Sequence, residues 1–448
     1  MSEINTPLFI GSKPMYSTLD MLKIFNQISQ FITGNGRQQD CSTPKGDFPM
    51  GEVISLADIE AARNLISRHI QPSPLSYSPV FSEIFGREVY LKWESKLPSG
   101  AFKERGAVNF LLNLSPEERK VGVCAASAGN HARALSLYAQ RLGIKCTIFM
   151  PKIAPLIKIQ ACEKNGAIVR LEGETFDESL SLALAYAKEK NLVFIHPFNH
   201  KLIMAGQGTC GLEILEQCPD VDAVVVPIGG GGLVSGIATA IKSKKPDCFV
   251  MGVKSEWAYA YQVGKPKPSF ETTIADGIAV KRIGELTGQV IEQKVDSIMT
   301  VTEAEIRKSV VYLLEQEKAV VEGGGGVGLC ALMSNKIPEK YKKIVVVISG
   351  GNIDMNLIST VIQRDLVERG RILRFSINGP DRPGLLNKVT SVIAGRSGNV
   401  LDVAHDRFPC NPGSVQIAFV VEVRDRSHGE EITKEIEAQG ITVVRREI

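Results

Sequence analysis

The sequence lacks the features that mark membrane, secreted and nucleic-acid-binding proteins. No apolar run approaches the roughly 18 residues that a membrane-spanning helix needs. A net charge of +3 over 448 residues gives no basic surface field, so neither nucleic acid nor a membrane is predicted as a partner. The chain does not start with a basic segment followed by a long apolar core, and its first arginine is Arg37, which disfavours secretory and mitochondrial addresses.

Cysteine is scarce, odd in number and never paired as CxxC. The nine cysteines are Cys41, Cys124, Cys146, Cys162, Cys210, Cys218, Cys248, Cys330 and Cys410. Scattered residues of this kind favour neither a disulfide framework nor a zinc site, and they are typical of a reducing cytosol. We therefore predict a cytoplasmic protein in which cysteine serves as a small buried hydrophobic residue.

The length favours two to three domains, and the pattern of the chain divides it into three regions. Residues 1–50 are an N-terminal extension, in which LDMLKIFNQISQF places apolar residues on one helical face. Residues 51–368 are predicted to form the main domain. Residues 372–448 are predicted to form a separate C-terminal domain, and DLVERGRI is the predicted linker.

From about residue 51 to residue 350, helical patterns alternate with short apolar runs. These runs are VGVCAAS, KCTIFM, AIVRLE, LVFIHP, DAVVVPI, CFVMGVKS and KIVVVISG. Near-continuously apolar strands belong to a parallel sheet that is buried on both faces, so the main domain is predicted to be α/β. Residues 372–448 instead have strands and helices in the order β, α, β, β, α, β, which predicts a ferredoxin-like sandwich.

The first of two glycine runs, Gly229 to Gly232 in PIGGGGLVSG, lies between a predicted buried strand and an amphipathic helix. Backbone N–H groups and the positive end of the helix dipole converge at such a turn, and residues without Cβ let the main chain approach phosphate oxygens. The run has neither the Lys-Ser/Thr ending of a Walker loop nor the spacing of a dinucleotide fingerprint. A phosphate monoester on a cofactor therefore fits better than a nucleotide.

The second glycine run, Gly323 to Gly326 in VEGGGGVGLC, follows a predicted helix rather than a strand. A phosphate cradle is disfavoured here, because no strong strand precedes the run, and close helix packing or a flexible turn is the ordinary interpretation. Its neighbour Glu322 is a carboxylate beside bare backbone, and we expect it to face a site.

Two further segments carry reactive side chains. Lys103 follows a Ser-Gly-Ala-Phe turn and precedes a helix, where positive charge is disfavoured, so its amine tends toward the neutral state that covalent chemistry with a carbonyl needs. Ser127, Asn130 and His131 lie between a predicted strand and a helix, where they can present donors to a carboxylate or a ring hydroxyl. A surface lysine and a helix-start histidine are the ordinary explanations for each residue alone; their conjunction favours a site.

The ordered motifs SGAFKERGA, SAGNHA, GGGGLVSG, ADGIAV and ISGGN resemble those of the pyridoxal-phosphate enzymes of the tryptophan-synthase-β fold, and specifically the serine/threonine dehydratases. The resemblance covers about residues 51–365. It implies a fold-type II enzyme with a small α/β subdomain at about residues 95–198 and a large one formed by the rest of 51–368. It also implies the conversion of L-threonine to 2-oxobutyrate and ammonia, and of L-serine to pyruvate, by a homodimer or homotetramer.

The resemblance assigns roles residue by residue. Lys103 is the expected catalytic lysine, which binds pyridoxal 5'-phosphate covalently and moves the α-proton. The expected cofactor contacts are Phe102 beside the ring, Asn130 at the ring 3-hydroxyl, Gly229, Gly230, Gly231, Gly232 and Leu233 around the phosphate, and Ser349 at the pyridine nitrogen. The expected substrate contacts are Ser127, Ala128, His131 and Glu322.

The sequence leaves other activities open. A serine-preferring or hydroxyaspartate dehydratase fits the same motifs, and a non-catalytic amino-acid sensor would retain the fold, although Lys103, Asn130 and Ser349 argue against it. A serine racemase is disfavoured, because Ala128 stands where those enzymes carry a second serine. Lys254 stands in the place of a glutamate of the racemase-type metal site, so no metal is predicted.

The C-terminal segment resembles an ACT domain, the amino-acid-sensing unit of biosynthetic and catabolic enzymes. NGPDRPGLLNKV matches its first strand-to-helix turn, so Asn378, Asp381, Gly384 and Leu385 are the expected contacts of an amino-acid effector. The resemblance thus implies allosteric control by an amino acid. A dimerisation module without a ligand is the alternative interpretation.

Overall fold

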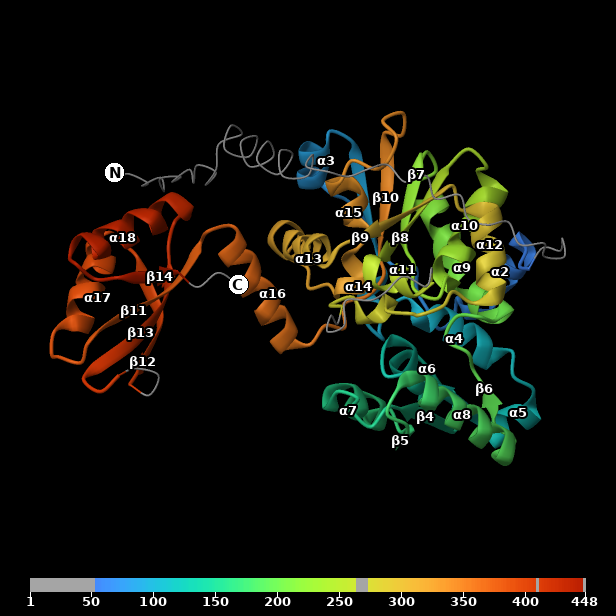
Figure 1. Ribbon diagram of the computed structural model, residues 1–448. Coiled ribbons are helices and arrows are strands. Elements are labelled where there is room, and N and C mark those ends of the chain that lie inside the picture. Colours follow the sequence, from blue (N-terminus) through green and yellow to red (C-terminus); the bar gives the residue numbers. More distant parts are fainter. Residues whose placement is uncertain (1–52, 263–272, 408–410, 446–448) are drawn as a thin grey trace, which may run out of the picture. The chain divides into compact units, whose positions relative to one another are not determined.

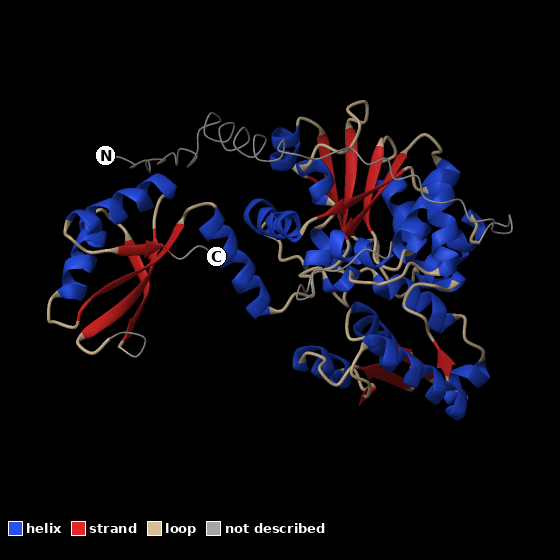
Figure 2. Ribbon diagram, in the orientation of Figure 1, coloured by secondary structure: helices blue, strands red, loops and turns tan. Residues whose placement is uncertain are grey.

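The structure is a computed structural model that describes residues 53–262, 273–407 and 411–445. The predicted amphipathic helix of the N-terminal extension lies outside these residues. Within them, none of the helices has the length and apolarity that crossing a bilayer requires. The strands of the described chain form the sheets shown in Figure 2.

A six-stranded sheet has the order β1-β2-β10-β7-β8-β9, and its edge strand β1 runs antiparallel to β2 while the other pairs are parallel. Its strands are β1 (Leu75–Tyr77), β2 (Glu88–Trp93), β7 (Ala223–Pro227), β8 (Phe249–Ser255), β9 (Ser297–Val301) and β10 (Lys343–Ile348). Helices cover both faces (Figure 1), so neighbouring residues such as Val224 and Val225 enter different apolar clusters. This burial confirms the parallel sheet that the apolar runs predict.

A second sheet consists of parallel strands in the order β5-β4-β3-β6. They are β3 (Val123–Ala126), β4 (Cys146–Met150), β5 (Ile168–Leu171) and β6 (Val193–Phe194). Each of these strands coincides with a predicted apolar run. The sheet lies within residues 95–198, and the boundaries of the two subdomains stay a prediction.

The helices of this part of the chain pack around the two sheets. They are α2 (Leu56–Ile66), α3 (Pro79–Phe85), α4 (Lys103–Leu112), α5 (Pro116–Val121), α6 (Asn130–Arg141), α7 (Leu156–Lys164), α8 (Phe176–Lys190), α9 (Lys201–Gln217), α10 (Gly232–Lys244), α11 (Glu256–Gln262), α12 (Glu285–Lys294), α13 (Glu303–Glu317), α14 (Gly323–Gly326), α15 (Leu329–Met333) and α16 (Met355–Glu368), with the short 3-10 helices η1 (Glu94–Lys96) and η2 (Asp276–Ile278). Capping boxes begin α2, α5 and α13, whereas α4, α6 and α10 begin without a side-chain cap. Side chains therefore leave the first N–H groups of these three helices to other partners, although in α4 the N–H of Arg105 donates to the carbonyl oxygen of Phe102 at 3.1 Å.

The C-terminal domain has the predicted βαββαβ order. Its elements are β11 (Ile372–Pro380), α17 (Leu385–Gly395), β12 (Asn399–Asp406), β13 (Ser414–Glu422), α18 (Arg426–Ala438) and β14 (Val443–Arg445). The strands form an antiparallel sheet in the order β12-β13-β11-β14. Both helices lie on one side of it (Figure 1), which explains why residues of β13 alternate between buried and half-buried. The ferredoxin-like prediction is confirmed.

The predicted linker DLVERGRI is wrong in half of its length. Asp365 to Glu368 form the last turn of α16, and only Arg369 to Arg371 separate that helix from β11. Arg369 pairs with Asp365 at 2.6 Å and with Glu315 of α13 at 2.8 Å. Charged residues of this segment are therefore ion-pair partners at a helix end.

The cysteine prediction is confirmed for the described residues. Those cysteines are buried and not joined in disulfides; they are Cys124, Cys146, Cys162, Cys210, Cys218, Cys248 and Cys330. Burial raises the pKa of the Cys162 thiol to about 11, which keeps it protonated and unreactive at neutral pH. Cys41 and Cys410 lie outside the described residues.

Candidate active site

The first glycine run connects β7 to α10, as the sequence predicts. Gly231 is the N-cap of α10 and has a φ of 96°, which residues with side chains rarely adopt. Within the described part of the chain, the backbone N–H groups of Gly229 to Leu233 donate to no hydrogen-bond acceptor. We call this segment the glycine cradle. Its buried donors surround the positive end of the α10 dipole, so it can hold an anion.

The four glycines of the cradle have no room for side chains. A Cβ added to Gly230 would fall under 3.0 Å from the ring of Phe198, and one added to Gly231 would fall under 3.0 Å from Thr287. Thr287 also supports the cradle from behind, because its Oγ1 donates to the carbonyl oxygen of Gly230 at 2.7 Å. Glycine is therefore required here for space as well as for backbone conformation.

Lys103 is the first residue of α4, and its Nζ donates a hydrogen bond to the carbonyl oxygen of Pro197 at 2.9 Å. Burial lowers the pKa of Lys103 to about 8, and the charge of Glu322 opposes part of this effect. The sequence attributes the neutral tendency of this lysine to its helix N-terminus, whereas the structure identifies burial as the largest cause. About half of the Lys103 amine is neutral at pH 8, so it is nucleophilic there.

The turn before Lys103 is attached to the loop after β10. The backbone N–H of Phe102 donates to the carbonyl oxygen of Ser349 at 3.0 Å, and the Phe102 ring lies 5.1 Å from Lys103 Nζ. Ser349 is buried, and its Oγ donates to the carbonyl oxygen of Gly324 at 3.4 Å. These contacts make one wall from two segments that are far apart in the sequence.

One pocket, which we call the glycine pocket, brings most of the predicted cofactor contacts together. They are Phe102, Lys103, Gly229, Gly230, Gly231, Gly232, Leu233 and Ser349. The sequence reasoning missed the other lining residues, which are Phe198, Pro227, Gly277, Ile278 and Val280. The motif ADGIAV contains the last three of them, and its presence among the ordered motifs was the available signal for this wall.

Asn130 and Glu322 lie beside the glycine pocket and bind each other. The Nδ2 of Asn130 donates to the Oε1 of Glu322 at 2.6 Å. A Cβ added to the lining residue Gly277 would lie 3.2 Å from that Oε1 and 3.6 Å from that Nδ2, so both polar atoms adjoin the pocket wall. Burial, followed by the charge of Asp276, raises the pKa of Glu322 to about 7. Glu322 therefore exchanges a proton near neutral pH.

The second glycine run is helical and tightly packed. Gly323 to Gly326 form α14, with Glu322 as its N-cap. A Cβ added to Gly323 would fall under 3.0 Å from the carbonyl oxygen of Ile274, and one added to Gly325 would fall under 3.0 Å from that of Gly350. The interpretation as close packing is confirmed, and the alternative of a flexible turn is wrong.

The predicted substrate contacts Ser127, Ala128 and His131 lie at the junction of β3 and α6. The Oγ of Ser127 accepts a hydrogen bond from the backbone N–H of Gly129 at 3.2 Å. His131 is buried, its Nε2 lies 3.2 Å from the carbonyl oxygen of Ile195, and burial is the main cause that lowers its pKa to about 3. The imidazole is therefore neutral at physiological pH. The contact of these residues with a substrate stays a prediction.

A buried ionic cluster holds the helix that carries Lys103. Arg105 binds Glu94 through Nε at 2.6 Å and Nη2 at 2.8 Å, and it binds Glu213 of α9 through Nη1 at 2.6 Å and Nη2 at 2.8 Å. Lys92 of β2 also reaches Glu213, at 2.6 Å. The four side chains are buried, and two positive charges balance two negative ones. Bidentate pairs of this kind fix α4 against η1 and α9.

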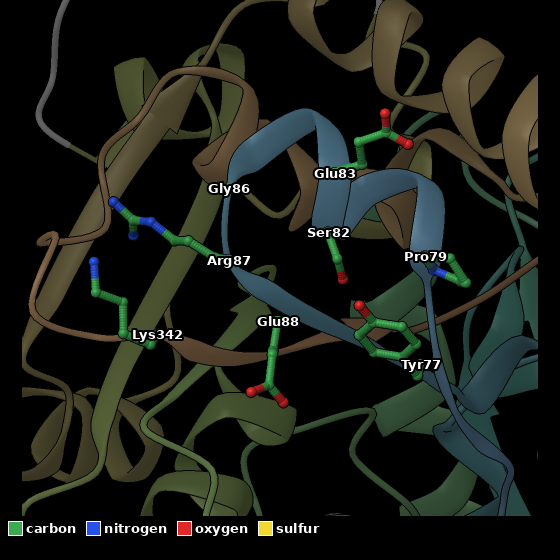
Figure 3. Close-up of a pocket in the computed structure, with 8 residues that line it drawn as sticks. All are labelled: Tyr77, Pro79, Ser82, Glu83, Gly86, Arg87, Glu88 and Lys342. Atoms are coloured by element: carbon green, nitrogen blue, oxygen red, sulfur yellow. The ribbon is translucent and has the colours of Figure 1, made fainter.

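A second depression, of about 470 Å³, lies beside the edge strand β1 (Figure 3). It is lined by Tyr77, Pro79, Ser82, Glu83, Gly86, Arg87, Glu88 and Lys342. Figure 3 shows Arg87 and Lys342 on one side, and the hydroxyls of Tyr77 and Ser82 pointing toward each other. This depression is open to solvent and its charges balance, whereas the glycine pocket joins a lysine of lowered pKa to unpaired backbone donors. We therefore assign the chemistry to the glycine pocket.

In the C-terminal domain, the predicted effector contacts lie around the turn from β11 to α17. Asn378 is near the end of β11, Gly384 is the N-cap of α17 with a φ of 98°, and Leu385 is its first residue. Asp381 accepts hydrogen bonds from Arg407 through Nε at 2.6 Å and Nη2 at 3.2 Å. The four residues thus share one end of the domain, and their contact with an effector stays a prediction.

Comparison with models of protein families finds two matches. Residues 66–350 match the family described as "Pyridoxal-phosphate dependent enzyme", and residues 372–440 match the ACT domain. The first match contains all the residues of the glycine pocket. The second begins at the first residue of β11 and includes the turn from β11 to α17.

Individual proteins match over most of the chain. The L-threonine ammonia-lyase of Thermotoga maritima is 44% identical over 398 residues, which cover 87% of this chain and 99% of that protein. The processed form of threonine deaminase isoform 2 from Solanum lycopersicum superposes with a TM-score of 0.63 at 35% identity, over 69% of this chain and 91% of that one. The serine racemase of Dictyostelium discoideum superposes with a TM-score of 0.63 at 32% identity, over 68% of this chain and 100% of that one.

Proposed function

The chain belongs to the family of pyridoxal-phosphate dependent enzymes, and from this membership we propose that it is a threonine ammonia-lyase. This activity converts L-threonine to 2-oxobutyrate and ammonia, and L-serine to pyruvate and ammonia. The observation that carries the proposal is that Lys103, with its lowered pKa, shares one pocket with the glycine cradle. The 44% identity to an L-threonine ammonia-lyase supports the choice of substrate.

The residues of the glycine pocket fit pyridoxal 5'-phosphate. The unpaired N–H groups of the glycine cradle would hold the phosphate. Lys103 would bind the aldehyde carbon, with Phe102 beside the ring, Ser349 at the ring nitrogen and Asn130 at the ring hydroxyl. When bound, the cofactor supplies an electron sink for the electron pair left at the α-carbon of an amino acid.

Lys103 is the proposed catalytic residue. Its Nζ has a pKa of about 8, so a neutral amine is present near neutral pH to take the proton from the α-carbon of L-threonine. The β-hydroxyl leaves with a proton as water, and hydrolysis of the released enamine returns that water. The net reaction is therefore L-threonine to 2-oxobutyrate and ammonia.

The junction of β3 and α6 is the proposed binding place of the substrate carboxylate. The helix α6 begins without a side-chain cap, so its first N–H groups and its dipole favour an anion there. Ser127 and Ala128 precede the helix, and the neutral ring of His131 supports its first turn from within. Glu322 can exchange a proton with a substrate at neutral pH, which supports its proposed place in the substrate site.

A racemase is the second candidate, because the racemase of Dictyostelium discoideum has a closely similar structure. Racemisation needs a proton donor on the face of the α-carbon opposite the lysine. Ala128 stands where the resemblance places the serine of racemases, and its methyl group cannot supply that proton. This difference favours elimination over racemisation.

The proposed function predicts the product of a direct assay. Purified protein supplied with pyridoxal 5'-phosphate and L-threonine should release equal amounts of 2-oxobutyrate and ammonia. L-serine and 3-hydroxyaspartate, assayed in parallel, would rank the three substrates by kcat/KM. D-serine formed faster than pyruvate would establish the racemase instead. Binding of L-threonine without any product would indicate a non-catalytic sensor and would overturn the proposal.

We propose that the ACT domain adjusts this activity through an amino acid bound at the turn from β11 to α17. The prediction is that Asp381→Ala weakens the response, because the Asp381–Arg407 pair fixes that turn. The measurement is the rate with and without L-isoleucine, L-valine or excess L-threonine, and the half-response concentration should rise several-fold. Glu435→Gln, which breaks the exposed Arg396–Glu435 pair between α17 and α18, is the matched control. An unchanged response in Asp381→Ala would favour a dimerisation module without a ligand at this turn.

A further inference from the structure

A chain of hydrogen bonds runs from the protein surface to the predicted cofactor contact Asn130. Exposed Arg133 donates from Nη1 to the Oδ1 of Asn352 at 2.8 Å. Asn352 Nδ2 donates to the Oδ1 of Asn130 at 2.8 Å and to the carbonyl oxygen of Ser99 at 2.9 Å. Asn130 Nδ2 in turn donates to Glu322 at 2.6 Å. Asn352 ends the motif ISGGN, and the proposed function gives it no role.

The partners of Asn352 permit only one orientation of its amide. A guanidinium donates and cannot accept, so the side of Asn352 that meets Arg133 must be the oxygen. A backbone carbonyl accepts and cannot donate, so the side that meets Ser99 must be the NH2 group. The second hydrogen of that group then meets Asn130, which must turn its own oxygen toward Asn352. The NH2 group of Asn130 is thereby directed to the side of Glu322 and the pocket.

The backbone leaves room for this chain at two glycines. A Cβ added to Gly100, which has a φ of 79°, would fall under 3.0 Å from the Oδ1 of Asn352. A Cβ added to Gly350 would fall under 3.0 Å from the Oε1 of Glu322. Gly100 belongs to the motif SGAFKERGA and Gly350 to ISGGN. The hydrogen-bond chain thus accounts for glycines of two motifs at positions that lie outside the phosphate cradle.

We propose that Asn352 and Arg133 are positioning residues that make Asn130 a hydrogen-bond donor, rather than an acceptor, toward the ring oxygen of the cofactor. One hydrogen of the Asn130 NH2 group goes to Glu322, and the other remains for a ligand next to Gly277. A donor at this place favours the ionised ring oxygen, which only accepts, over the hydroxyl. The inference rests on the proposed function, because it takes pyridoxal 5'-phosphate as the ligand.

The test measures a preference between two ligands. Apoprotein is dialysed against pyridoxal 5'-phosphate and against 3-deoxypyridoxal 5'-phosphate, which lacks the ring oxygen. Wild-type protein should bind the first about tenfold more tightly, as expected of a hydrogen bond to a charged group. In Asn352→Asp, a carboxylate that only accepts replaces the amide, and the preference should fall to about threefold or less. A general loosening of the fold weakens both ligands alike, so it leaves the ratio unchanged.

Two further variants keep the test decisive. Asn113→Asp makes the same chemical change at the C-cap of α4, where Nδ2 donates to Asn109, and should keep the tenfold preference. Arg133→Met removes the outer donor at an exposed position and should reduce the preference partially. It replaces Asn352→Asp as the deciding variant if circular dichroism shows that Asn352→Asp is unfolded. The proposal is overturned if folded Asn352→Asp keeps the tenfold preference for pyridoxal 5'-phosphate. If Asn352→Asp does not fold, the same result in Arg133→Met overturns it. Equal binding of both ligands by the wild type also overturns it, whereas the proposed function fails only if L-threonine yields no 2-oxobutyrate.

Discussion

Lys103→Ala is expected to lower the turnover of L-threonine by at least about 10³-fold, because proton transfer and covalent attachment of the cofactor both depend on one Nζ atom. That atom lies in the glycine pocket with a pKa of about 8, and none of the other described pocket residues carries an amine. The measurement is 2-oxobutyrate formation at saturating cofactor, together with the visible absorption that a lysine-bound cofactor shows. Both signals should be lost.

Two control variants and one pH series test whether activity depends on the neutral amine of Lys103 or on its positive charge. Lys103→Arg keeps the charge but not a neutral amine at accessible pH, so it should be as inactive as Lys103→Ala. Lys96→Ala removes an exposed lysine nearby and should retain activity. Wild-type apoprotein should also take up pyridoxal 5'-phosphate faster as pH rises through about 8, since the neutral share of Lys103 grows from about a tenth at pH 7 to about nine tenths at pH 9. Substantial activity in Lys103→Ala would refute the assignment.

Arg105→Met is expected to lower the free energy of unfolding by about 3–5 kcal/mol. This is the loss typical when one partner of a buried ion pair is removed and the other stays charged. The change leaves Glu94 and Glu213 buried, and Lys92 is the buried cation that still opposes them. Urea denaturation of the apoprotein, followed by circular dichroism, measures the change through its midpoint and slope. Because Arg105 lies two positions after Lys103, a folded fraction of the variant should also bind the cofactor less tightly.

The matched control is Arg63→Met, which removes a half-exposed arginine paired with Glu216 on the same helix α9. An exposed pair contributes about 0–1 kcal/mol, so this variant should stay within about 1 kcal/mol of the wild type. The double change Arg105→Met with Glu94→Gln removes one of the two carboxylates that lose Arg105 as a partner. It should recover part of the lost free energy of unfolding. Equal stabilities of Arg105→Met and Arg63→Met would show that the buried cluster contributes no more than a surface pair.

The fold could be predicted wherever a run of residues has one environment along its whole length. The strands β7 and β10 are buried on both faces, so their apolar runs identify them. The strand β2 was missed because Glu88 and Lys92 interrupt its apolar character, and Lys92 is nevertheless buried through its contact with Glu213. The end of α16 was assigned to the linker because its pairs, such as the one between Arg369 and Glu315 of α13, join residues that are distant in the sequence.

The site was predictable where the chemistry depends on one local segment. The glycine cradle needs only a strand, a turn and a helix, all of which are adjacent in the sequence. Phe198 and Asn352 were missed because their importance comes from contacts with Gly230 and Asn130, which are distant in the chain. Oligomeric state and cellular location depend on surfaces and partners outside one chain, and they stay predictions of the sequence.

The two glycine runs serve different partners. Around α14 the space beside the glycines is taken by the protein's own backbone, at Ile274 and Gly350, so those glycines serve the folded state at all times. In the glycine cradle the N–H groups remain without acceptors in the protein. A ligand that accepts from these N–H groups binds the folded protein and not the unfolded chain, so cofactor binding is linked to stability. At a free cofactor concentration of about 100 Kd this linkage adds about 2.7 kcal/mol to the free energy of unfolding, so the supply of cofactor adjusts stability as well as activity.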